Sequence, residues 1–177
     1  MTMLIQILAH TPRWVFVLFA VLIWFGAKQL FAGTVSLAKI TVMPVAMTGL
    51  AIYGVAGTFG SSPMALVGWA AAAAVFIAVL LQRPLPATTR FDAPTRSFHV
   101  AGSAVPLALM MGIFFTKYVV GVAIAMHPEL RQQSLFAVGV PVLYGAFSGI
   151  FTGRALRLWK LAIRADRAEA GLPPVQA

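Results

Sequence analysis

Long apolar segments separated by short polar or turn-forming stretches are the dominant pattern along this chain. Each segment has 20–24 residues, which at ~1.5 Å rise per residue is enough for a helix to cross a ~30 Å hydrocarbon core. The pattern predicts an all-α membrane protein with a bundle of five transmembrane helices in one domain, residues 1–162. The predicted spans are residues 11–31, 36–59, 63–82, 105–126 and 135–156.

Turn signals define the ends of these spans. Thr11 is the expected N-cap of the first span, with Pro12 in its first turn, and Ser62 with Pro63 repeats this arrangement in the third. Residues 32–35 are expected to form a tight turn, and residues 1–10 a short helix in the outer interface.

The connection between the third and fourth spans, residues 83–103, is the longest and most polar. Three prolines exclude a continuous helix there. Residues 89–92 and 96–100 flank a turn at Pro94, so they predict a short cytoplasmic β-hairpin, with Phe98 and Val100 on one face and Ser97 and His99 on the other. The alternative is an irregular loop on lipid headgroups.

Basic residues continue past the fifth span at steps of three or four, which places them on one stripe of a helix. We therefore predict a basic amphipathic cytoplasmic helix over residues 154–171, lying against anionic headgroups, followed by a disordered tail, residues 172–177. The stripe comprises Arg154, Arg157, Lys160, Arg164 and Arg167.

Charge gives the expected orientation. With the N-terminus outside and the C-terminus in the cytoplasm, ten of the 13 lysines and arginines fall on the inner side, as the positive-inside rule requires. The net charge of +9 is thereby assigned to topology and anionic lipid, and nucleic acid is not expected as a partner. With no cysteine, the chain itself cannot form disulfides or use thiol chemistry.

Lys117 is the main candidate for ligand binding, together with its neighbour Tyr118. It lies about two residues past the midpoint of its span, where a lysine costs roughly 2.5–3.5 kcal/mol on insertion scales. We expect it to face the bundle interior, where it either contacts an anion or a wet cavity, or bonds to carbonyls in a purely structural role. Lys39, near the inner end of the second span, is a weaker candidate because it can reach the headgroups.

Two further groups of residues concern helix geometry. Pro44 and Pro141 each remove one helical hydrogen bond, so both are expected to bend their helices. Three glycines at four-residue spacing allow close helix packing, which we expect within the monomer, while a homo-oligomer or another membrane protein remains an alternative partner. These glycines are Gly145, Gly149 and Gly153.

No catalytic motif for a hydrolase, a metalloprotease or a nucleotide-binding enzyme occurs in the chain. The three histidines, His10, His99 and His127, are scattered over both sides. The sequence therefore predicts neither an enzyme nor a metal site, and no cofactor.

Several short runs resemble an uncharacterised bacterial inner-membrane family. The resemblance covers about residues 3–162, and weaker similarity to the CcdC-like proteins involves residues 39–44 and 91–100. The family likeness implies the topology but no site residues. The runs are residues 3–16, 90–92, 98–103, 106–110 and 116–118.

The expected function is a non-catalytic structural, assembly or accessory role in the bacterial inner membrane. The alternative is a small transporter or binder of anionic or lipid-like solutes that uses Lys117. A dry packed bundle favours the first role, and a cavity at Lys117 favours the second.

Overall fold

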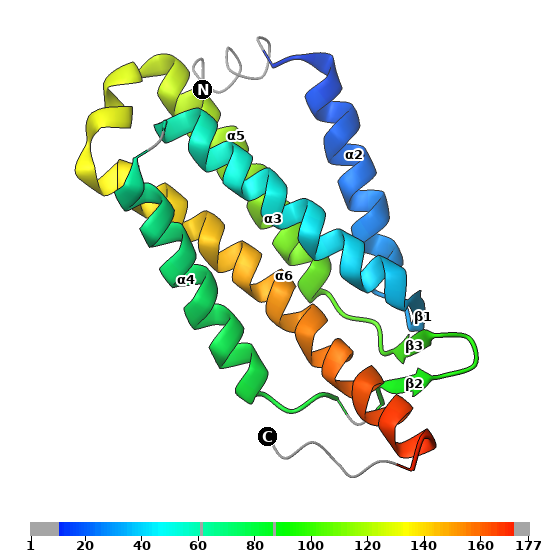
Figure 1. Cartoon of the computed structure of the whole chain (residues 1–177). Helices are drawn as coiled ribbons and strands as arrows, with labels where there is room; N and C mark the ends of the chain where they lie inside the picture. Colours follow the sequence, from blue (N-terminus) through cyan, green and yellow to red (C-terminus); the bar gives the residue numbers. More distant parts are fainter. Residues whose placement is uncertain (1–10, 61, 87, 172–177) are drawn as a thin grey trace. The chain divides into compact units, whose positions relative to one another are not determined.

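The computed structural model describes residues 11–60, 62–86 and 88–171. It divides into two compact units (Figure 1). Unit 1 comprises Met1–Phe31 and Gly102–Leu130, and unit 2 comprises Ala32–Ala101 and Arg131–Ala177.

Unit 1 is an antiparallel helix pair formed by α2 (Arg13–Lys28) and α5 (Val105–Met126). Gly26 lets the two helices approach, because a Cβ at this position would collide with Leu107. Residues later in unit 1's first segment contact residues earlier in its second, which shows that the pair is antiparallel. They join Thr11 to Tyr118, Phe19 to Phe114 and Gln29 to Ser103.

The first predicted span is shorter in the structure than in the sequence pattern. Helix α2 has 16 residues and begins after Pro12, which makes no side-chain cap. At ~1.5 Å per residue it is about 24 Å long, less than the ~30 Å hydrocarbon core. Thr11 was wrongly predicted as the cap, since its hydroxyl is hydrogen-bonded to that of Tyr118 at 2.6 Å. The short helix predicted for residues 1–10 lies outside the described residues.

Four helices in the described part of the chain are long and apolar enough to cross a membrane. The ranges of the first three agree closely with the second to fourth predicted spans, and the last contains the fifth predicted span and continues beyond it. All four fit a multi-pass membrane protein. The fifth crossing, through α2, stays a prediction. The four helices are α3 (Leu37–Phe59), α4 (Pro63–Gln82), α5 and α6 (Ser134–Glu169).

Large apolar side chains remain exposed along these helices. Val45 on α3 is 67% exposed, Val67 on α4 is 61% exposed and Val119 on α5 is 61% exposed. A water-soluble protein rarely leaves such continuous apolar surface uncovered. The hydrocarbon of a bilayer is the environment that this surface fits.

In unit 2, α6 packs along both α3 and α4, but in opposite senses. Helix α6 runs antiparallel to α3, as the pairs Thr41–Trp159 and Thr48–Thr152 show. It runs parallel to α4, alongside it over most of the length of α4 (Figure 1). Alternating membrane crossings require these relative directions for the second, third and fifth spans.

The parallel pair α4–α6 depends on the absence of side chains on α6. A Cβ at Gly145 would collide with the Trp69 carbonyl oxygen, one at Gly149 would lie 2.5 Å from the Ala73 carbonyl oxygen, and one at Gly153 would lie 3.0 Å from Leu80 Cβ. All three glycines therefore face the neighbouring helix of the same chain. This is the close packing that small residues permit in membranes.

A small antiparallel sheet completes unit 2, with strands in the order β1-β3-β2. The hairpin β2 (Arg90–Asp92) and β3 (Ser97–Val100) confirms the predicted strands and faces. The third strand, β1 (Gly33–Ser36), was not predicted. Residues 32–35 were expected to be a tight turn, but Thr34 and Val35 pair with His99 and Phe98 across the open edge of β3.

Helix α6 is one continuous helix of 36 residues, about 54 Å long. The predicted fifth span and the predicted basic helix are thus parts of one rod. It ends at Glu169, and Gly171 adopts a left-handed φ of 66° just beyond, as its sequence position predicts. The predicted disordered tail, residues 172–177, lies outside the described residues.

The polar connection before α6 contains a short 3₁₀ helix, η1 (Pro128–Gln132). The Glu129 carboxylate lies 3.0 Å from Nδ1 of His127. Hydrogen bonding, first to its own backbone N–H and then to His127, holds the pKa of Glu129 below its ordinary value.

We expect Gly149→Ala to destabilise the protein by about 1–3 kcal/mol, because the new methyl group overpacks the α4–α6 contact. The matched control is Gly139→Ala on the same helix, where a Cβ would meet nothing within 4 Å. The control should be neutral or stabilising by up to about 1 kcal/mol, since alanine favours a helix over glycine. Thermal unfolding of both variants in detergent measures the difference, and equal stabilities would contradict the packing argument.

Candidate functional site

One end of unit 2 gathers most of its charge. Of the ten lysines and arginines in its residue ranges, all except Arg131 lie at the end formed by the sheet, the start of α3, the end of α4 and the second half of α6. With three carboxylates at the same end, this leaves a formal charge of +6 (9 − 3). We call this part of unit 2 the basic end.

Three hydrogen bonds and the ion pair of Arg96 with Asp166 join the elements of the basic end. The Leu37 N–H donates to the Arg96 carbonyl at 3.0 Å, which ties α3 to the hairpin turn. The Arg157 guanidinium donates to the Pro84 carbonyl, which ties α6 to the chain leaving α4. The third contact links α6 to α3 through Trp159 and Thr41.

A small apolar core holds the sheet against the helices. Phe98 is fully buried, and its ring centroid lies 4.8 Å from that of Phe91 on the adjacent strand. Ile40 of α3 and Ala155 and Ala162 of α6 complete the buried cluster. The sheet therefore covers an apolar side of α6, and the predicted basic helix is a continuation of α6 rather than a separate element. Its contact with anionic headgroups stays a prediction.

The cations of the basic stripe differ in exposure. Lys160 and Arg164 are exposed, whereas Arg154, Arg157 and Arg167 are half-buried. Since the apolar side of this helix packs on the sheet, the exposed cations remain available to anionic surfaces.

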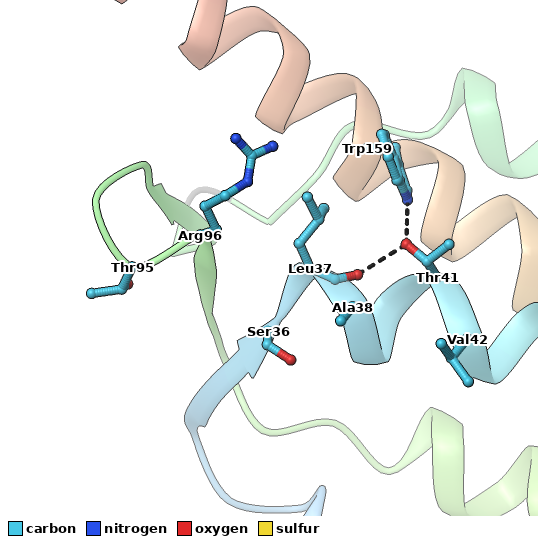
Figure 2. A pocket seen from close by; sticks show the side chains of 8 residues that line it. All are labelled: Ser36, Leu37, Ala38, Thr41, Val42, Thr95, Arg96 and Trp159. Carbon is cyan, nitrogen blue, oxygen red and sulfur yellow. Dashed lines mark hydrogen bonds between the residues drawn. The ribbon is translucent and has the colours of Figure 1, made fainter.

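An open groove of about 510 Å³ lies at the basic end, between the start of α3, the hairpin turn and Trp159 (Figure 2). Its walls are mainly apolar, with a few hydroxyls and one guanidinium. The lining residues are Ser36, Leu37, Ala38, Thr41, Val42, Thr95, Arg96 and Trp159.

A short hydrogen-bond chain fixes the tryptophan wall of the groove. The Trp159 indole N–H donates to the Thr41 hydroxyl at 3.0 Å, and that hydroxyl donates to the Leu37 carbonyl at 2.9 Å. Figure 2 shows both bonds above the first turns of α3. The indole is thus oriented, and its polar atom is satisfied at the groove floor.

Arg96 forms the charged rim of the groove. It ends the hairpin turn with a left-handed φ of 45°, the only such non-glycine residue in the described part of the chain. The Arg96 N–H donates to the Ala93 carbonyl at 3.2 Å, which closes the turn. Its guanidinium lies 3.6 Å from the Asp166 carboxylate, and its side chain remains 59% exposed.

The residues that the sequence suggested for ligand binding belong to different units of the structure. Lys39 is exposed in the first turn of α3, where its N–H donates to the Ser36 hydroxyl at 3.4 Å, but its side chain does not line the groove. Lys117 and Tyr118 lie on α5 in unit 1, and Tyr118 bonds Thr11. Lys117 is exposed on the helix pair of unit 1, and its predicted position facing the interior of a five-helix bundle stays a prediction.

The two prolines are buried inside continuous helices, Pro44 in α3 and Pro141 in α6. Each leaves one carbonyl of the preceding turn without its helical donor, at Ile40 and Ala137. Both helices continue past the proline without interruption.

Sequence reasoning missed Arg96, Thr41 and Trp159 as parts of one site. Arg96 was counted only as an inner charge, and its place two residues after Pro94 was the available signal for a turn residue. The pairing of Thr41 with Trp159 had no sequence signal, because it depends on which helices pack together. In the described residues, no three histidine or acidic side chains come together as a potential metal site.

Comparison with known proteins places the chain in a family without assigning an activity. No curated protein and no solved structure matches it significantly. The matching family model covers residues 1–171, nearly the whole chain, and it gives no support to a relationship with the CcdC-like proteins. The chain belongs to a family of unknown function, DUF6622.

Proposed function

We propose that this chain is a non-catalytic accessory protein of a bacterial inner membrane, with its N-terminus outside and its C-terminus in the cytoplasm. The observation that carries the orientation is the concentration of nine of the ten cations of unit 2 at one end. Positive charge is retained on the cytoplasmic side of a membrane, so the basic end faces the cytoplasm.

The proposal includes five crossings. Helix α2 alone is about 24 Å long, but the predicted first span extends to residues 11–31 and can cover the ~30 Å core. Antiparallel pairing of α2 with α5 fits two successive crossings in opposite directions. An odd number of spans then separates an outside N-terminus from a cytoplasmic C-terminus.

The basic end supports an accessory role because it is a built surface on a protein with few loops. The sheet, the second half of α6 and the start of α3 share one buried core around Phe98. One sheet face packs on this core, while Thr34, Arg90 and His99 are exposed on the other. An ordered polar face on a membrane bundle is suited to contact with another membrane protein or a second copy.

The alternative proposal is a binder or transporter of anionic or lipid-like solutes at Lys117. The exposed Lys117 side chain near the middle of α5, next to Tyr118, favours it. A cation at this depth is costly unless it contacts a polar or anionic group. The first proposal requires an intact basic end, whereas the second requires the Lys117 side chain.

A reporter fused after Ala177 should lie in the cytoplasm, and one inserted within residues 129–133 should lie in the periplasm. The physical reason is the charge asymmetry of the connections. Paired phosphatase and fluorescent-protein fusions measure both positions. Finding both sites on the same side would remove one crossing and contradict the five-span proposal.

Phe98→Ala should abolish the accessory function while the spans still insert. Truncating a fully buried phenylalanine costs about 3–5 kcal/mol, enough to loosen the sheet without altering the apolar helices. The measurement is complementation of a gene deletion in the native host at matched protein levels. His99→Ala, on the exposed face of the same strand, controls for the substitution itself. Full complementation by Phe98→Ala, with the sheet shown to be loosened, would argue against the accessory role.

Lys117→Met should leave complementation intact if the accessory proposal holds, because it removes an expensive charge and keeps the length of the side chain. If Lys117 binds an anion, function should fall while insertion and stability persist. Lys117→Arg should then restore function poorly, since a guanidinium is larger and planar. The same deletion strain measures all three variants, and loss of function in Lys117→Met alone would favour the alternative.

A further inference from the structure

We infer that the groove at the basic end binds an anionic phospholipid, with the phosphate at Arg96 and one acyl chain along Ala38 and Val42. The inference rests on the proposed membrane placement of α3 and α6. It goes beyond that placement by assigning a ligand class and a site.

The groove lies at the depth of a lipid headgroup. Thr41 is in the second turn of α3, so the Trp159 indole bonded to it lies about 6 Å inside the start of that helix. Tryptophan concentrates at this depth because its ring is apolar and its N–H is polar. The open side of the groove therefore meets the boundary between headgroups and acyl chains.

The lining changes from polar to apolar in the direction that a phospholipid requires. The polar part of the lining lies next to the first residue of α3, where the proposed placement puts water and headgroups. It consists of Ser36 and the hairpin-turn residues Thr95 and Arg96. Ala38 and Val42 follow at four-residue spacing on one face of α3, and both are exposed. Val45, three residues beyond Val42 and also exposed, extends the apolar path toward the membrane core.

Charge selects an anionic headgroup over a neutral one. Arg96 is the only charged residue lining the groove, and the basic end around it has a formal charge of +6. A planar guanidinium offers up to five donors and matches phosphate oxygens with two parallel hydrogen bonds. The Asp166 carboxylate lies 3.6 Å from one guanidinium nitrogen, and the exposed remainder of the guanidinium can donate hydrogen bonds to a phosphate.

The backbone at Arg96 supports a role for its side chain. A left-handed φ of 45° favours glycine or asparagine, so an arginine there is strained. The turn itself does not require a long cationic side chain. A side chain that lines the groove and pairs with Asp166 gives a reason for arginine at this position.

The experiment uses the fluorescence of Trp159 as a local probe. Replacing Trp14, Trp24 and Trp69 with phenylalanine leaves Trp159 as the single tryptophan. The protein is reconstituted in phosphatidylcholine vesicles in which an increasing fraction is replaced by brominated phosphatidylglycerol, or by brominated phosphatidylcholine with the same chains. Bromine quenches only tryptophans in direct contact, so Trp159 should be quenched at a lower fraction of the anionic lipid.

Arg96→Gly should reduce this preference about fivefold, as loss of one interfacial cation–lipid contact predicts, while relieving the turn backbone. Asp166→Asn should increase the preference, because it frees the guanidinium. Arg83→Gln removes an exposed cation outside the groove at the same end and should leave the preference unchanged. Native mass spectrometry of the protein with all four tryptophans, counting retained phosphatidylglycerol, checks the result without the three replacements.

Equal quenching by the two lipids, or a preference unaffected by Arg96→Gly, would overturn the inference. Quenching by neither lipid would overturn it in favour of a protein segment covering the groove, and relief of quenching by inorganic phosphate in favour of a soluble anion. The vesicles carry the same lipid in both leaflets, so the result does not depend on orientation. An unexpected topology in the reporter fusions would therefore leave this test valid.

Discussion

The close approach of α6 to α4 is the contact on which unit 2 depends. Where the glycines of α6 meet the carbonyls of Trp69 and Ala73, no side chain separates the two backbones. Apolar side chains gain little by leaving lipid for another apolar surface, so helix association in a membrane relies on such dense backbone packing. The parallel alignment also brings the end of α4 beside Arg157, whose guanidinium binds the Pro84 carbonyl. One packing surface thus sets the positions of the chain segments that enter the basic end.

The basic end is packed like a water-soluble protein, with its large apolar side chains buried in a small core. Beyond the predicted end of the fifth span, α6 continues with apolar residues on one side and cations on the other, and the sheet covers the apolar side. Phe98 is fully buried there, whereas many side chains of similar size on the membrane helices are exposed. Under the proposed topology this region lies in water, where burial of apolar surface stabilises it. One continuous helix would then pass from hydrocarbon into water.

The sequence predicted the elements whose signals are local. The length of the apolar segments predicted α3, α4 and α5 to within a residue, and the turn at Pro94 with its flanking residues predicted both strands of the hairpin. Strand β1 was not predicted because its four residues begin with a glycine and resemble a turn, and only pairing with the distant β3 makes them a strand. The groove was also not predicted, because it depends on a contact between Thr41 and Trp159, which are 118 residues apart in the sequence. Lys117 was conspicuous in the sequence, but its environment depends on helix packing, and the structure leaves its side chain exposed.

Depth in the membrane separates the two cations considered for anion binding. A lysine near the middle of a span has lost its hydration, and that cost must be offset by a polar or anionic partner. Such a lysine therefore contributes to binding only if the partner is enclosed with it inside the membrane. Arg96 lies at the proposed interface, where its exposed side chain keeps its hydration until a phosphate displaces it. Its pairing with Asp166 keeps the guanidinium near the groove at little cost, since exposed ion pairs contribute only about 0–1 kcal/mol. A weak pair that a phosphate can replace is suited to reversible lipid contact, and this favours Arg96 over Lys117 as the residue that recognises an anionic headgroup.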